Sequence, residues 1–175
     1  MKVISIGDLV TDFYYKNGKL VGVNGGMTSH NIIANIAKFG METAVYGACG
    51  ADKAGDIAIK SLKDLGVNVE NIKILDSLKT RCFHVSYFNK NNKLEFTSKK
   101  RCPFCNTKKW YEESQIDPDD ILQKINKEDV LVFDNLNSKN QTIIDGCENR
   151  KMLDLGQYFE LDPYTKEEIT LKIQN

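Results

Sequence analysis

The sequence predicts an α/β fold in which a mostly parallel sheet is covered by helices on both faces. Short apolar strands alternate with amphipathic helices along the chain, which is the pattern of such sheets. The strand at 3–6 is followed by apolar residues at helical spacing over 32–39, and Gly40 ends this helix. With 175 residues, of which 41% are hydrophobic, the chain can bury one core, so one domain over 1–175 is expected.

The alternation continues towards the C-terminus. Asp117-Pro118 begins a helix, and the apolar strand Val130–Phe133 ends at Asp134. The other expected elements are a strand at 43–48, a helix at 53–65, an extended segment at 67–75, helices at 139–148 and 166–173, and a strand at 151–153. Gly7-Asp8, Asp134 and Asp154 would then lie at the carboxyl edge of the sheet, where open α/β sheets bind ligands.

Two segments, about 12–24 and 80–98, are expected to form β-hairpins. The dipeptide Asn17-Gly18 is a strong signal for a tight turn between two strands. Asn89, Asn91 and Asn92 lie near the tip of the second hairpin.

The composition excludes several classes of function. Lys plus Arg equal Asp plus Glu at 24 each, whereas nucleic-acid and membrane-surface binders need a positive excess. No apolar run approaches the roughly 20 residues that span a bilayer. The apolar part of the first residues is too short for a signal peptide, and five cysteines without such a signal favour reduced thiols. A cytoplasmic protein is expected.

The most informative segment is 25–40, where a glycine pair runs into Thr28 and Ser29 and then a helix. Glycines allow close approach of the backbone to a ligand, and Thr28 and Ser29 are candidate caps for the helix. No Gly-Lys-Ser/Thr follows, which excludes a Walker-type phosphate loop, and the Gly-x-Gly-x-x-Gly spacing of dinucleotide-binding folds is absent. The turn suits a polar or hydroxylated small molecule.

The order of these glycines resembles the N-terminal signature of the ribokinase family, the PfkB-type carbohydrate kinases. The matching positions are Gly25, Gly26, Asn31, Gly40, Gly47, Gly50, Asp52 and Gly55. The strand ending in Gly7-Asp8, the nearby Asp12 and the closing Leu65-Gly66-Val67 also match. The resemblance covers the whole chain but only the first half or somewhat more of a family member. It implies a ribokinase-like fold with a small β-hairpin lid, incomplete at the C-terminus.

The resemblance implies a sugar or nucleoside kinase that transfers the γ-phosphate of ATP to a hydroxymethyl group, with Mg²⁺ and ATP as cofactors of the full-length protein. Carboxylates suit a sugar because each can accept hydrogen bonds from two adjacent hydroxyls. The substrate-binding residues carried over are Asp12, Gly25, Gly26, Asn31 and Asp134. Ribokinases proper have a polar residue two positions before the early aspartate, whereas this chain has Val10, which argues against ribose.

The family's Asp-Thr-x-Gly-Ala-Gly-Asp-like segment has no counterpart in this sequence. That segment supports phosphoryl transfer through positioning and electrostatics, and its last aspartate is the catalytic base. The catalytic aspartate is therefore expected beyond this chain, and the chain alone is expected to be inactive and to bind ATP poorly. The alternative is a non-catalytic module that binds a sugar or a metal. Self-association is expected through the lid strands or an uncovered sheet edge.

Cys102 and Cys105 form a Cys-x-x-Cys turn. Such a turn can be structural with free thiols, can supply half of a zinc site, or can act as a redox pair. The sequence leaves these three interpretations open and commits no metal site. His30, beside the glycine loop, is interpreted as a packing or surface residue, because a lone histidine is seldom a ligand.

Overall fold

The larger of two β-sheets is parallel throughout. This computed structural model describes residues 1–90, 93–99, 104, 106 and 114–154. The larger sheet has five strands in the order β5-β4-β1-β8-β9, and every neighbouring pair is parallel. Its strands are β1 (Val3–Ile6), β4 (Thr43–Gly50), β5 (Asn68–Leu75), β8 (Val130–Phe133) and β9 (Arg150–Leu153). The predicted parallel sheet is confirmed.

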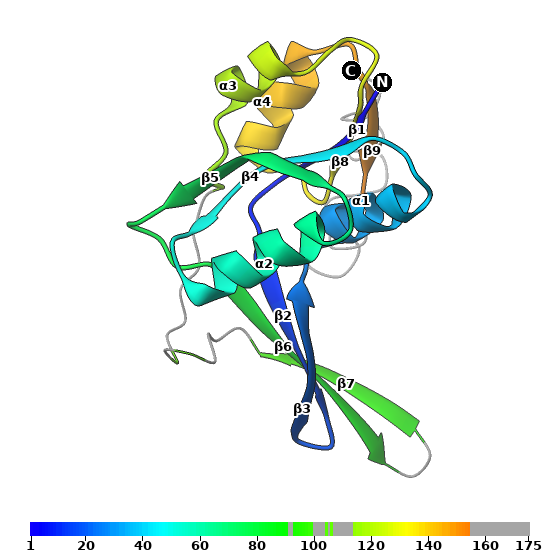
Figure 1. The fold of residues 1–175 in the computed structure, drawn as a ribbon, viewed down its shortest axis with the longest axis vertical. Coiled ribbons are helices and arrows are strands. Elements are labelled where there is room, and N and C mark those ends of the chain that lie inside the picture. Colours follow the sequence, from blue (N-terminus) through cyan, green and yellow to red (C-terminus); the bar gives the residue numbers. More distant parts are fainter. Residues whose placement is uncertain (91–92, 100–103, 105, 107–113, 155–175) are drawn as a thin grey trace.

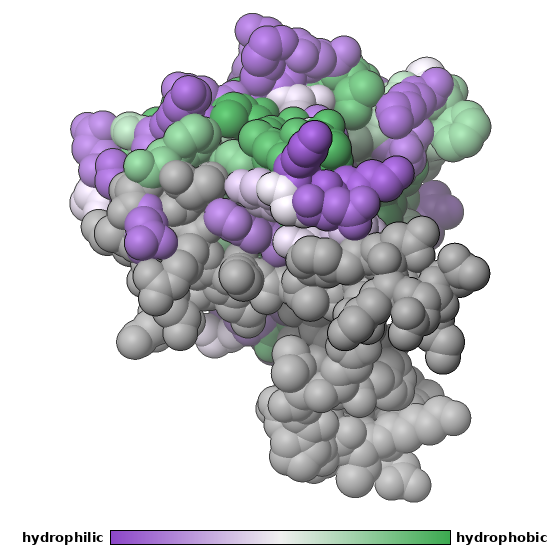
Figure 2. Space-filling model, turned by 90° about the horizontal axis from the view of Figure 1, so that it is seen from below, coloured by the Kyte–Doolittle hydropathy of each residue, from purple (hydrophilic) through white to green (hydrophobic). Residues whose placement is uncertain are grey.

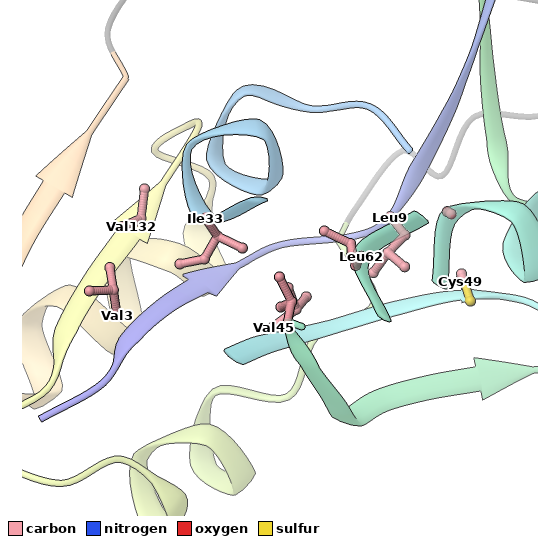
Figure 3. Packing of buried hydrophobic residues seen from close by; sticks show 9 residues of the cluster. Val3, Leu9, Ile33, Val45, Cys49, Leu62 and Val132 are labelled. Atoms are coloured by element: carbon pink, nitrogen blue, oxygen red, sulfur yellow. The ribbon is translucent and has the colours of Figure 1, made fainter. Parts of the chain in front are cut away.

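Helices cover both faces of this sheet, as predicted (Figure 1). One face packs against α1 (Thr28–Lys38) and α2 (Lys53–Lys63), and the other against α3 (Pro118–Lys124) and α4 (Ser138–Gly146). Ile33 of α1 and Leu62 of α2 lie in one core cluster with Val45 of the sheet (Figure 3). Successive residues of a strand point to opposite faces, so Val3 joins this cluster while Ile4 joins the other.

The two hairpins join in a second sheet, called here the hairpin sheet, with the order β3-β2-β6-β7. Its strands are β2 (Val10–Lys16), β3 (Lys19–Gly25), β6 (Arg81–Lys90) and β7 (Lys93–Lys99). Asn17 and Gly18 both have positive φ (48° and 78°), as a tight hairpin turn requires. The hairpins meet through a parallel pairing of β2 with β6, and together they project below the larger sheet in Figure 1.

Most predicted helix ends are confirmed, but the expected cap of α1 is wrong. Gly40 and Gly66 follow α1 and α2 with φ of 78° and 82°. The residue before α1 is Met27, at φ 76°, and no side chain caps this helix. Neither Thr28 nor Ser29 serves as the cap, because both lie inside the helix, where the Ser29 hydroxyl is turned towards Asp134. The helix expected at 166–173 lies outside the described residues.

The surface mixes polar and apolar side chains. Seen from below, hydrophobic residues gather in one area that hydrophilic residues border (Figure 2). Some apolar side chains are strongly exposed, among them Phe39 at 86% and Val21 at 61%. No helix in the described part of the chain is long and apolar enough to cross a membrane.

Candidate functional site

Three aspartates follow neighbouring strands at the carboxyl edge of the larger sheet. The parallel register aligns Ile6 of β1 with Phe133 of β8, and Phe133 with Leu153 of β9. Asp8, Asp134 and Asp154 follow these strand ends, so the predicted edge is present. Both carboxylate oxygens of Asp8 accept a hydrogen bond from the Gln115 backbone N–H at 3.1 Å. Burial raises the pKa of Asp8 despite these contacts.

Asp134 is the most deeply buried of the three, at 1% exposure. Its Oδ2 accepts from the Ser29 hydroxyl at 3.4 Å, and its Oδ1 accepts from the Asn135 side-chain amide at 3.1 Å. The pKa of Asp134 is raised to about 6. Burial is the main cause, and the neighbouring charges of Asp154 and Asp8 act in the same direction. A carboxyl group held in this way can accept hydrogen bonds from a polar ligand that replaces its missing hydration.

Asp12 lies on β2 of the hairpin sheet and is fixed against the second glycine of the pair. A Cβ added to Gly26 would lie 2.5 Å from the carboxylate atoms of Asp12, so only glycine fits without moving that side chain. The Tyr14 hydroxyl donates to Asp12 Oδ2 at 3.2 Å. Burial raises the pKa of Asp12, although the Tyr14 hydrogen bond opposes that rise.

A short chain segment links the two carboxylates. Gly26 lies against Asp12, and Ser29 donates to Asp134. Because Gly26 and Ser29 are three residues apart, their Cα atoms are within about 11 Å of each other. The structure therefore places Asp12, Gly26 and Asp134 around the junction of the two sheets, where two carboxylates and a close backbone approach can hold a hydroxylated molecule.

Gly25 and Asn31 lie elsewhere. The Gly25 backbone N–H donates to the Ser61 hydroxyl of α2 at 2.9 Å, and a Cβ at Gly25 would lie 2.5 Å from that hydroxyl. Asn31 is exposed and, with Gly25, lines a groove between α1 and α2. Asp12, Gly26 and Asp134 do not line this groove. The two glycines thus face opposite sides of the chain, and the sequence-predicted set is divided between two places.

His30 is buried next to this site, a position that the sequence did not predict. It is 2% exposed, and its Nδ1 lies 2.6 Å from the Ser5 hydroxyl and 3.4 Å from that of Ser29. Burial lowers the pKa of His30 to about 4, so the ring is neutral at pH 7 and Nδ1 can accept from Ser5. His30 therefore forms a hydrogen bond with Ser5 of β1 and lies beside Ser29, which donates to Asp134. The available signal was its spacing of three from Ile33, which places both on the inward face of the helix.

Among the described residues, no group of three or more His, Cys, Asp or Glu side chains could hold a metal ion. Cys102 and Cys105 lie outside those residues, so the zinc, redox and structural interpretations of this pair stay predictions. The residues around the junction can accept hydrogen bonds from hydroxyl groups, which favours a neutral, hydroxylated ligand.

Solved sugar kinases have a similar structure. An uncharacterised sugar kinase from Pyrococcus horikoshii matches with a TM-score of 0.64 and 15% identity, covering 99% of this chain and 58% of that one. The 2-dehydro-3-deoxygluconokinase of Thermotoga maritima has a TM-score of 0.66 at 16% identity, with coverages of 99% and 56%. Arabidopsis thaliana ribokinase, solved with ribose and ATP, has a TM-score of 0.63 at 15% identity, with coverages of 98% and 67%.

The comparisons of sequence alone find less. No protein-family model matches the chain, and no curated protein matches it. The chain spans 58% of the length of the Pyrococcus kinase and 56% of the Thermotoga kinase. The likeness is thus one of fold, and it extends over essentially the whole chain.

Proposed function

We propose that this chain, which has the ribokinase-like α/β fold, is the substrate-binding part of an ATP-dependent sugar or nucleoside kinase. In the complete kinase, the γ-phosphate of ATP would pass to a hydroxymethyl group of the substrate. The observation that carries this proposal is the placement of Asp12 and Asp134 at the two ends of the segment 26–29. Solved relatives that contain ATP, from Pyrococcus horikoshii and Arabidopsis thaliana, support the choice of phosphate donor.

The two carboxylates hold the substrate by accepting hydrogen bonds from its hydroxyl groups. Among the described residues, Tyr14 is the only hydrogen-bond partner of the Asp12 side chain, so Asp12 retains acceptor capacity for a ligand. Gly26 lets the backbone lie close against Asp12, because a Cβ at this position would be 2.5 Å from the carboxylate atoms. The burial of Asp134 strengthens its hydrogen bonds and excludes competing water. Asn31 and Gly25 are not part of this arrangement, because they line the groove between α1 and α2.

The described residues contain no group of three or more His, Cys, Asp or Glu side chains that could hold a metal ion. The sequence also lacks the glycine-rich segment ending in aspartate that the family uses for transfer. We propose that the chain alone binds the substrate without phosphorylating it. A cytoplasmic location, where ATP is abundant and thiols stay reduced, agrees with this role.

We also propose that the chain self-associates through the hairpin sheet. In the described part of the chain, β3 is the outer strand of this sheet, beyond β2. Leu20 and Val21 on β3 are 52% and 61% exposed. An exposed strand edge with apolar side chains can pair with the same edge of a second copy.

A thermal-shift panel of sugars and nucleosides, with and without Mg²⁺–ATP, tests the proposal. At least one sugar or nucleoside is expected to raise the melting temperature, because ligands that bind the folded state stabilise it. Asp12→Asn should abolish this shift, whereas Asp56→Asn, on an exposed position of α2, should retain it. ADP formation is measured in parallel and should not exceed background.

Three outcomes contradict the proposal. If no compound in the panel stabilises the chain, the substrate-binding role is wrong. If Asp12→Asn and Asp56→Asn behave alike, the site is misplaced. ADP formation above background, or stabilisation by ATP alone, shows that the chain contains the nucleotide site after all.

A further inference from the structure

A groove of about 450 Å³ separates α1 from α2 on one face of the larger sheet. This volume lies within the range of small-molecule sites, about 300–1,000 Å³. Residues of α1, of α2 and of the end of β3 line this groove. The polar lining residues that bear on its ligand are Asn24, Asn31, Asn35, Lys38, Ser61 and Asp64.

The charges in the groove leave one cation without a counterion. Asp64 forms an ion pair with Lys60, one turn earlier on α2. Lys38 contacts only the Asn35 side-chain oxygen, at 3.4 Å, and within the described part of the chain no carboxylate pairs with it. The unneutralised charge of the groove is therefore positive.

Two amide side chains in the groove are also available to a ligand. Asn24 and Asn31 make no side-chain hydrogen bond with any described residue. Each amide offers two donors and an acceptor. Asn31, Asn35 and Lys38 lie on one face of α1 because they are spaced by four and three residues. From Asn31 to Lys38 the helix rises about 10 Å, which suits a ligand with a charged head and a polar body.

We propose that this groove binds a small hydroxylated organic anion. Its carboxylate or phosphate group contacts the Lys38 ammonium, and its hydroxyl groups contact the free amides of Asn31 and Asn24. The groove is separate from the proposed sugar site, because Gly25 faces the groove while Gly26 faces Asp12. Asp12 and Asp134, which would repel an anion, do not line it. The inference thus goes beyond the proposed function and does not depend on it.

Titration of the full chain with D-gluconate, D-glucose 6-phosphate and D-glucose, followed by calorimetry and ligand-observed NMR, tests the proposal. The two anions represent the carboxylate and phosphate forms of the same chemistry, and glucose is their neutral counterpart. Lys38→Gln should lower the affinity for the bound anion by about tenfold or more, because it removes a charge-assisted contact. Lys63→Gln, at an exposed lysine of α2 that does not line the groove, should leave the affinity unchanged.

Asp12→Asn separates this proposal from the sugar site, since it should impair sugar binding and leave anion binding intact. The proposal is supported if gluconate, glucose 6-phosphate or both bind. Which of them binds shows whether the groove accepts a carboxylate, a phosphate or either group. The proposal is overturned if neither anion binds. An affinity that is unchanged in Lys38→Gln, or lost in Asp12→Asn, also overturns it by placing the anion elsewhere.

Discussion

Replacing Asp134 with asparagine removes a buried charge while keeping its hydrogen-bond partners. The new amide oxygen can accept from the Asn135 side chain, as Oδ1 does now. The new amide N–H can donate to the Ser29 hydroxyl, in place of the hydrogen bond that Ser29 now donates to Oδ2. The variant should therefore differ from the native chain mainly by the charge.

The expected gain in stability follows from the shifted pKa. The pKa of Asp134 is about 6 in the folded chain, against an ordinary value of 3.8 for this side chain. A difference of about two pKa units corresponds to about 3 kcal/mol of free energy of unfolding. Between pH 3.8 and 6 the folded chain holds more protons than the unfolded chain, so the native protein loses stability as pH rises through this window. Asp134→Asn should lack that loss and be more stable by about 3 kcal/mol at pH 7.

Urea unfolding at several pH values between 4 and 7 measures this effect. Asp129→Asn is the matched control, because Asp129 is also buried but both of its oxygens accept from backbone N–H groups, those of Lys2 and Asn126. An amide there would place N–H against N–H, so this variant should be destabilised by about 1–3 kcal/mol. If Asp134→Asn is less stable than the native chain at pH 7, or its advantage does not grow from pH 4 to pH 6, the reasoning is refuted.

Three glycine and aspartate substitutions give further expectations. Gly26→Ala should push the Asp12 side chain aside, lowering sugar affinity about tenfold with little change in melting temperature; retained affinity would count against the site. Gly47→Ala places a Cβ against the Gly7 carbonyl oxygen and should cost about 3 kcal/mol in urea unfolding, whereas a neutral result would mean that the strands separate easily. Asp52→Ala should lower the free energy of unfolding by about 2 kcal/mol in the same assay, because it removes both the α2 cap and the hydrogen bond from the Thr80 N–H. A loss below about 0.5 kcal/mol, about the least that a cap contributes, would contradict this.

Local signals account for the elements that the sequence predicts correctly. Asn17-Gly18 tolerates the two positive φ angles of a tight turn, so the first hairpin follows from two residues. The run Val130–Phe133 is apolar throughout, as a strand covered on both faces must be. The predicted cap at Thr28 or Ser29 is wrong because the helix begins at Thr28 and so contains both residues. The Ser29 hydroxyl instead donates to Asp134, 105 residues away along the chain, and no local rule detects such a partner.

The sequence predicted the candidate site only in part, because contacts between distant residues leave no local signal. Asp12, Gly26 and Asp134 were chosen by resemblance, and the structure places them around one junction, although ligand binding by them stays a prediction. Gly25 and Asn31 were chosen in the same way, yet they line the groove between α1 and α2. Adjacent residues of an extended segment point in opposite directions, so a motif read as one site can serve two.

The sequence by itself determined the identity and order of the strands and helices, because apolar periodicity and turn residues act within a few positions. It also determined that the carboxyl ends of β1, β8 and β9 carry aspartates. Only the tertiary structure decided that β2 pairs with β6, which joins the two hairpins into one sheet, and that Ser29 reaches Asp134. These contacts link residues far apart in the chain, and their free energy depends on packing and burial that exist only in the folded protein.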